Sequence, residues 1–75
     1  MTAAAMWLPE TGAFDGQLLR VAILVRGWTL AEFASAAGLR EGTVYAAARG
    51  HPVQHRTAIR IFRALAQREP MRIAS

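Results

Sequence analysis

The 75-residue sequence contains no cysteine and no lysine. Without cysteine there is no disulfide scaffold, no thiol nucleophile and no Cys-based zinc site. Long apolar stretches are also missing: the longest runs, Ala3–Leu8 and Val21–Val25, have six and five residues, whereas a bilayer-spanning helix needs about 20. The N-terminus has neither the basic head nor the apolar stretch of a secretory signal. We therefore expect a soluble, cytoplasmic protein.

Groups that could act in catalysis or bind a cofactor are scarce. The two serines, Ser35 and Ser75, have no histidine and acidic partners nearby. His51 and His55 have the spacing of a metal-binding pair, but Pro52 lies between them and no third ligand is evident. No glycine-rich loop follows a strand, as a nucleotide site would require. The sequence predicts neither an enzyme nor a metal or cofactor site.

All of the basic residues are arginines, and they outnumber the acidic residues. Nine basic residues, all arginine, stand against five acidic ones, giving a net charge of +4 and a pI of about 11.5. Nucleic-acid-binding domains commonly have a pI above about 9. A GC-rich genome would also enrich arginine and the 16 alanines. Charge alone therefore favours a polyanionic partner without establishing one.

Capping residues and apolar spacing predict short helices behind an irregular N-terminus. Residues 1–13 include Pro9 and Gly12 and have no helical period, so we expect an N-terminal arm. Asp15 is a good N-cap for a first helix that ends at Gly27. Thr29 and Glu32 have the spacing of a capping box, which opens a second helix.

Two further helices complete the prediction. Gly38 ends the second helix, residues 41–49 form the third, and residues 54–68 form the fourth, before Pro70. Inward-facing positions are Leu18, Leu19, Ala22, Ile23 and Val25, then Phe33, Ala34 and Ala37, then Val44, Ala47 and Ala48, and finally Ala58, Ile59, Phe62, Leu65 and Ala66. No alternating apolar pattern of strand length occurs. The predicted fold is an all-α, compact bundle of four to five short helices, with a domain over residues 14–68 and a C-terminal tail over 69–75.

The second and third helices lie unusually close in sequence. Only Gly38, Leu39 and Arg40 separate them, which is the arrangement of a helix-turn-helix. Gly38 can adopt the left-handed conformation that such a turn needs. Ala34 is small enough for the two backbones to approach, and Leu39 and Val44 fill the corner.

The segment Leu30–Arg49 resembles the twenty-residue motif of the Cro/C1 (Xre-type) helix-turn-helix DNA-binding family. The framework residues that match the motif are Ala34, Gly38, Leu39, Val44 and Ala47. The flanking residues are also similar, so the resemblance extends over residues 15–68. It implies a lambda-repressor-like fold and a small regulator of phage or plasmid type, active in a bacterial cell or a phage-infected host. The implied function is a dimeric, Cro-like repressor that places residues 41–49 in the major groove of double-stranded DNA.

The matching family positions suggest which side chains would contact DNA. The base-contact candidates are Arg40, Glu41, Thr43, Tyr45 and Ala46. Arginine can pair with guanine, glutamate can accept from cytosine, and threonine or alanine can meet a thymine methyl group. The phosphate-contact candidates are Thr29, Arg49, Arg56 and Arg60.

Three positions depart from the family pattern. Leu30 replaces a glutamine that often bonds a phosphate, so that bond cannot form. Arg40 replaces the usual serine or threonine cap of the recognition helix, which leaves a free amide there. Gly42, at a position often used for base contact, has no side chain.

Other functions remain open. An antitoxin of a toxin–antitoxin pair would bind its own promoter and a toxin. A helix-turn-helix scaffold could instead serve as a protein-interaction module, and the loss of side chains at Gly42 fits that idea. For the regulator, we expect a homodimer whose contact involves the last helix and the tail residues Met71 and Ile73; Trp7 and Leu8, the apolar residues at the other end, either patch the core or form a partner surface.

Overall fold

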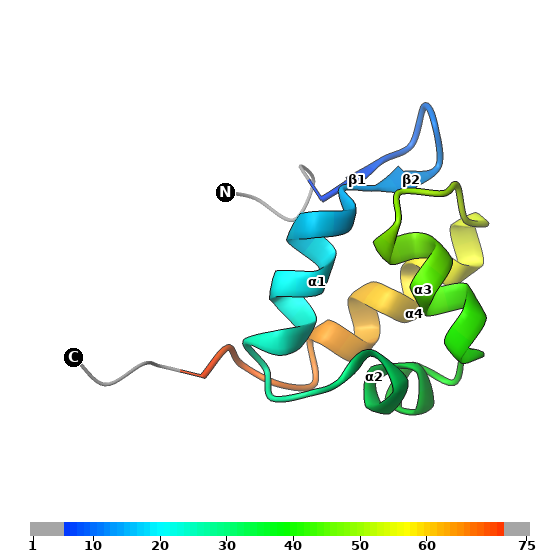
Figure 1. Ribbon diagram of the computed structural model, residues 1–75. Coiled ribbons are helices and arrows are strands. Elements are labelled where there is room, and N and C mark those ends of the chain that lie inside the picture. The colour runs from blue at the N-terminus through cyan, green and yellow to red at the C-terminus, as the bar shows by residue number, and fades with distance from the viewer. Residues whose placement is uncertain (1–5, 72–75) are drawn as a thin grey trace.

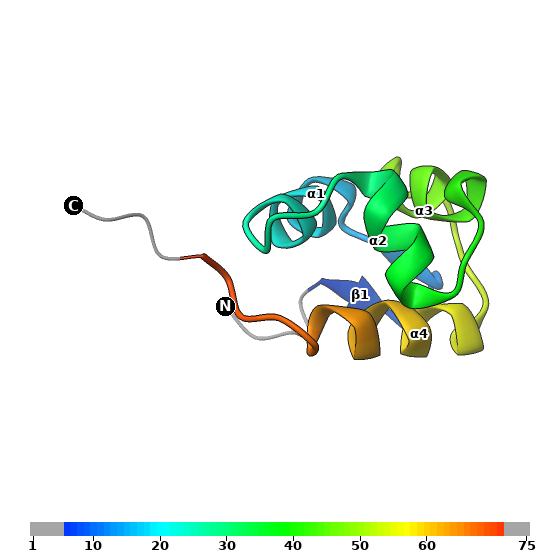
Figure 2. The ribbon, with the colours of Figure 1, turned by 90° about the horizontal axis from the view of Figure 1, so that it is seen from below.

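The computed structural model describes residues 6–71 as four helices and a short hairpin. In chain order the elements are β1 (Trp7–Leu8), β2 (Ala13–Phe14), α1 (Gly16–Leu24), α2 (Leu30–Ala37), α3 (Glu41–Ala48) and α4 (His55–Leu65). Seen from below, α4 runs along one side of the molecule, with α1, α2 and α3 on the other side (Figure 2). Within residues 6–71, no helix has the length and apolar character needed to cross a membrane.

All four helices contribute to one small core. Its largest fully buried side chains are Leu19, Ile23, Phe33, Val44 and Ile61. Trp28 meets Phe33 edge-on, with ring centroids 5.3 Å apart, a preferred geometry for aromatic pairs. The predicted inward residues of α1 to α3 are largely confirmed: Leu19, Ala22, Ile23, Phe33, Ala34, Val44, Ala47 and Ala48 are all buried.

The predicted inward face of α4 is partly wrong. Ile59 is 38% exposed and Ala66, just past the helix end, is exposed, whereas Ile61 and Ala64 are buried. Ile61 lies three residues after the buried Ala58, so the two share a helix face, while Ile59 is rotated away from both. Much of the inward face of α4 is formed by small alanines and not by Ile59.

The structure also contains a hairpin that the all-α prediction misses. Trp7 pairs with Phe14 and Leu8 with Ala13 in an antiparallel register, and the connection includes Gly12 at φ +71°. Two-residue strands are too short to show an alternating pattern. The fold is therefore mostly helical, with a small two-stranded sheet beside it (Figure 1).

The hairpin packs on the domain and braces the linker between α3 and α4. The Trp7 ring lies 6.3 Å from that of Phe14 and 5.7 Å from that of His55. The backbone amide of Val53 donates to the carbonyl of Gly12 at 2.8 Å. The described part of the predicted arm, residues 6–13, thus belongs to the folded body, and residues 1–5 lie outside the described residues.

Two arginines, Arg26 and Arg68, connect the carboxyl ends of α1 and α4. Arg26 donates from Nε to the carbonyls of Leu65 and Arg68, both at 3.0 Å, and from its terminal nitrogen to Ala22 at 2.8 Å. Arg68 returns a bond to the Arg26 carbonyl at 3.2 Å and lies 4.4 Å above the Trp28 ring. A cation at a helix carboxyl end is favourable because the last carbonyls lack intrahelical donors. These contacts hold the ends of α1 and α4 together.

Candidate nucleic-acid interface

The α2–α3 pair has the local geometry of a tight helical turn. Thr29 accepts from the Glu32 amide at 3.1 Å and Glu32 accepts from the Thr29 amide at 2.9 Å, so the predicted capping box is confirmed. The bond from the Thr29 amide to the Glu32 carboxylate, together with the Thr29 hydroxyl, lowers the pKa of Glu32 below its ordinary value. Gly38 has the predicted left-handed conformation, at φ +69°, and the Leu39 amide donates to the Ala34 carbonyl at 2.8 Å.

Packing against the core fixes the orientation of α3. Val44 and Ala47 are fully buried and Ala48 is 4% exposed. Ala34 is also buried, and Leu39 packs against the same core cluster. The framework residues of the motif therefore lie at the contact between α2 and α3 and between α3 and the core.

The opposite face of α3 is accessible. Glu41, Gly42, Tyr45 and Arg49 are exposed, while Thr43 and Ala46 are half-buried beside the start of α4. Tyr45 is 41% exposed. Arg40, the residue that precedes α3, is exposed as well. The other four base-contact candidates lie on α3 itself.

Two helix N-termini near this face have no side-chain cap. Arg40 precedes α3 and Gln54 precedes α4, and neither side chain accepts a bond from its helix. The first amides of each helix have no intrahelical acceptor and contribute partial positive charge. Phosphate oxygens and carboxylates are favourable ligands for such amides.

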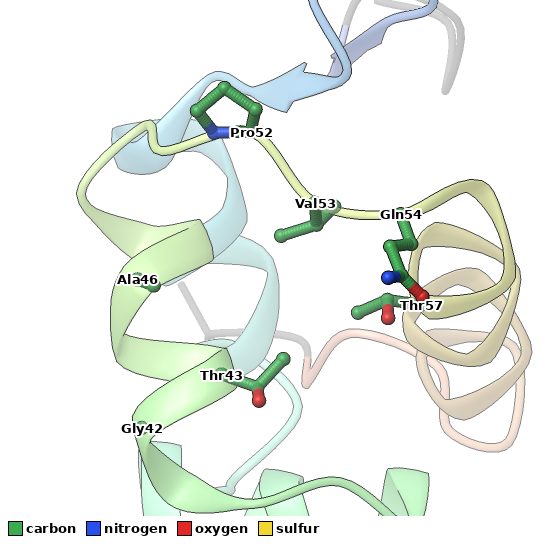
Figure 3. A pocket seen from close by; sticks show the side chains of 7 residues that line it. All are labelled: Gly42, Thr43, Ala46, Pro52, Val53, Gln54 and Thr57. Carbon is green, nitrogen blue, oxygen red and sulfur yellow. The ribbon is translucent and has the colours of Figure 1, made fainter.

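A groove of about 480 Å³ separates α3 from the start of α4. Seven residues line it: Gly42, Thr43, Ala46, Pro52, Val53, Gln54 and Thr57. Figure 3 shows Val53 and Thr57 pointing toward α3, and Thr43 pointing back toward them. Apart from Gln54 and the two hydroxyls, the walls are aliphatic.

A second hollow, of about 470 Å³, is lined by Gln17, Arg20, Val21 and Ala48. It lies at the carboxyl end of α3, where the helix dipole is negative. Arg20 and the first turn of α1 add positive charge at this hollow, so charge does not separate the two; the groove beside α3 differs in being lined by the base-contact candidates Thr43 and Ala46.

The phosphate-contact candidates differ in their surroundings. Arg49 follows α3 and Arg56 lies in the first turn of α4, and both are exposed. Arg60 donates to the Gly38 carbonyl at 3.1 Å, so it braces the turn between α2 and α3. Thr29 is exposed, but its hydroxyl oxygen caps α2.

Sequence reasoning overlooked the far wall of the groove. The sequence pattern does not indicate Val53 or Thr57, and it predicts Gln54 as a helix start whose free amides face the DNA backbone. The linker of residues 49–54 is held beside α3 by the hairpin, through the Val53–Gly12 bond and a bridge between Ala13 and Pro52. No local pattern in the sequence indicates that contact.

Comparison with known proteins does not assign this surface. The chain matches no family model, no curated protein and no solved structure. Its function therefore has to be argued from the geometry and charge of the described residues.

Proposed function

We propose that this protein is a sequence-specific regulator of transcription that binds double-stranded DNA. It acts as a dimeric, Cro-like repressor, with α3 in the major groove. The observation that supports this most strongly is the tight α2–Gly38–α3 turn, which leaves one face of α3 exposed beside two uncapped helix N-termini. The major groove of B-DNA is wide enough to admit a helix.

The distribution of arginines also favours a nucleic acid. Arg26, Arg60 and Arg68 donate to carbonyls of their own chain. In contrast, Arg40 and Arg49, at the two ends of α3, make no side-chain hydrogen bond within residues 6–71, and neither do the exposed Arg20 on α1 and Arg63 on α4. Their charge is available to neutralise phosphates, as is that of the exposed Arg56.

Individual side chains on α3 have complementary partners on base edges. Arg40 would pair with O6 and N7 of guanine, and Glu41 would accept from N4 of cytosine. Thr43 and Ala46 have methyl groups that suit thymine. Tyr45 would contact a base edge or a phosphate.

The dimer contact would use the last helix and the C-terminal tail. Met71 is 63% exposed, and its amide donates to the Val25 carbonyl at 2.6 Å, so the tail passes the end of α1. Ile73 lies outside the described residues. A double variant, Met71→Asp with Ile73→Asp, should be monomeric in sedimentation; a variant that remains dimeric would exclude this contact.

The decisive experiment is binding of the purified protein to duplex DNA from upstream of its own gene. A scrambled duplex of equal composition serves as the control, at two salt concentrations. We expect a preference of about a thousandfold or more, with affinity falling steeply as salt rises. Equal binding to both duplexes would refute sequence specificity. No binding to either at low salt would refute DNA binding and favour a protein-interaction module.

One substitution tests how α3 would recognise its site. Arg40→Ala should lose about 1–3 kcal/mol of binding free energy, confined to particular base positions. An equal loss on every sequence would make Arg40 a phosphate contact instead.

A further inference from the structure

Within residues 6–71, neither the backbone conformation nor the packing requires a glycine at position 42. The backbone needs glycine at Gly12, Gly27, Gly38 and Gly50, which have positive φ. At Gly16, a Cβ would collide with the Ala48 carbonyl. Gly42 has neither constraint: its φ is not positive, and no atom of the described residues lies within 4 Å of where its Cβ would be.

Glycine at this position weakens the protein. A glycine in a helix interior costs about 1 kcal/mol relative to alanine; Gly42, the second residue of the eight-residue α3, carries part of that cost. The fold would accommodate alanine there without strain. The reason for a glycine is then to be sought outside the chain, in a partner that comes close to α3.

The surroundings of Gly42 indicate the chemistry of that partner. Gly42 and Ala46, one turn apart, form one side of the groove, and Val53 and Thr57 form the other (Figure 3). The groove is thus shaped by aliphatic groups and open at the glycine. Among the groups that base pairs present in the major groove, the C5-methyl of thymine is the apolar one.

We propose that this groove receives the C5-methyl group of a thymine, and that the DNA passes closest to α3 at Gly42. This inference rests on the proposed DNA-binding function and names the base pair that the groove recognises. Gln54 is exposed at the rim of the groove. Its side-chain amide has a donor and an acceptor, which match N7 and N6 of the adenine in the same A·T pair.

Charge favours DNA over an apolar peptide as the occupant. Arg40 and Arg49 flank α3, Arg56 lies in the first turn of α4, and all three are exposed. The uncapped N-termini of α3 and α4 add partial positive charge beside the groove. An apolar groove with positive charge beside it suits the methyl group of a thymine, because DNA carries that methyl group together with its negative phosphates.

The first test removes the methyl group from the DNA. In the upstream duplex that binds the wild-type protein, each thymine is replaced in turn by deoxyuridine, which keeps base pairing. At one position per half-site we expect affinity to fall about fourfold, the equivalent of about 0.8 kcal/mol for one buried methyl group. Loss of affinity at no thymine would overturn the proposal.

The second test removes the wall of the groove. In a Val53→Ala variant, the deoxyuridine penalty at that position should shrink toward onefold, because the lost contact is the same one. Val21→Ala makes the same truncation at a residue of α1 that is 49% exposed and outside this groove, and it should keep the full penalty. An undiminished penalty in Val53→Ala would overturn the assignment of the groove.

The third test concerns Gly42 itself. Gly42→Ala should raise the melting temperature and still lower affinity for the upstream duplex about tenfold, because its methyl group occupies the space through which the DNA passes. Unchanged affinity would refute close approach at Gly42. If wild-type protein shows no preference for the upstream duplex, the proposed function fails; if it does, and only these substitutions have no effect, the inference alone fails.

Discussion

Arg26 should be the arginine on which the stability of the domain depends most. Its single guanidinium holds the carbonyls of Ala22, Leu65 and Arg68 at 2.8 to 3.0 Å. Arg26→Ala leaves these carbonyls, at the ends of α1 and α4, without that donor. The substitution also removes one of the contacts between the last turn of α4 and the end of α1, while the bond from Arg68 to the carbonyl of residue 26 remains possible.

The size of the effect follows from those bonds. A hydrogen bond to a charged group contributes about 1.5–3 kcal/mol. The three bonds share one partly exposed cation and are not additive, so we expect a loss of about 3 kcal/mol in the free energy of unfolding. In a domain of this size, that corresponds to a fall in Tm of about 12–24 °C.

Thermal unfolding followed by circular dichroism measures this loss, with two comparison variants. Arg20→Ala removes the same charge from an exposed position of α1 and should change stability by no more than about 0.5 kcal/mol. Arg26→Lys should recover only part of the loss, because an ammonium group lacks the planar fork of donors. Equal Tm values for Arg26→Ala and Arg20→Ala would refute the bracing role of Arg26.

Two other substitutions test local packing and capping. Gly16→Ala should cost about 1–3 kcal/mol, because its methyl group collides with the Ala48 carbonyl; an unchanged Tm would show that α1 does not approach α3 so closely. The bonds from Thr29 lower the pKa of Glu32, so the stability they provide is complete above the unfolded pKa of about 4.3 and is lost as pH falls through the lowered value. Denaturant unfolding from pH 6 to 2 should therefore be less pH-dependent in Glu32→Gln than in the wild type, and identical slopes would contradict this linkage.

The sequence predicted what depends on neighbouring residues. Asp15 accepts from the amides of Gln17 and Leu18, as its N-cap position predicted. Each such motif is complete within four residues, so its signal is present in the sequence itself. The boundaries of the four helices were predicted to within about three residues for the same reason.

The features that were missed depend on contacts between distant segments. The hairpin brings Gly12 to Val53, and this contact places the linker beside α3. The groove follows from it, because Val53 and Thr57 become a wall only when the linker is held there. The apolar pattern of residues 54–68 predicts Ile59 on the inward face together with Ala58, whereas Ala58 and Ile61 form the face that packs.

The arginines of residues 6–71 differ in their bonding: Arg26, Arg60 and Arg68 donate to backbone carbonyls, whereas Arg20, Arg40, Arg49, Arg56 and Arg63 are exposed and make no side-chain hydrogen bond there. Arg26 and Arg60 bind carbonyls at the ends of helices, so these two side chains stabilise the fold, although Arg60 is exposed and keeps its charge at the surface. Arg40, Arg49 and Arg56, which lie beside α3 or in the first turn of α4, are exposed and make no such bond within residues 6–71. Net charge and pI count both groups alike, so composition does not separate arginines that support the fold from arginines that are available to a partner.

This difference in bonding has a measurable consequence. Replacing Arg49 by alanine should leave Tm within about 4 °C of the wild-type value and reduce the slope of log affinity against log salt by about 1, the loss of one phosphate contact. Replacing Arg60 should lower Tm, because the Gly38 carbonyl loses its donor, and change the salt slope less. Equal changes of the salt slope and equal Tm values in the two variants would refute this difference between Arg49 and Arg60. The positions of the arginines would then give no information about the partner of α3.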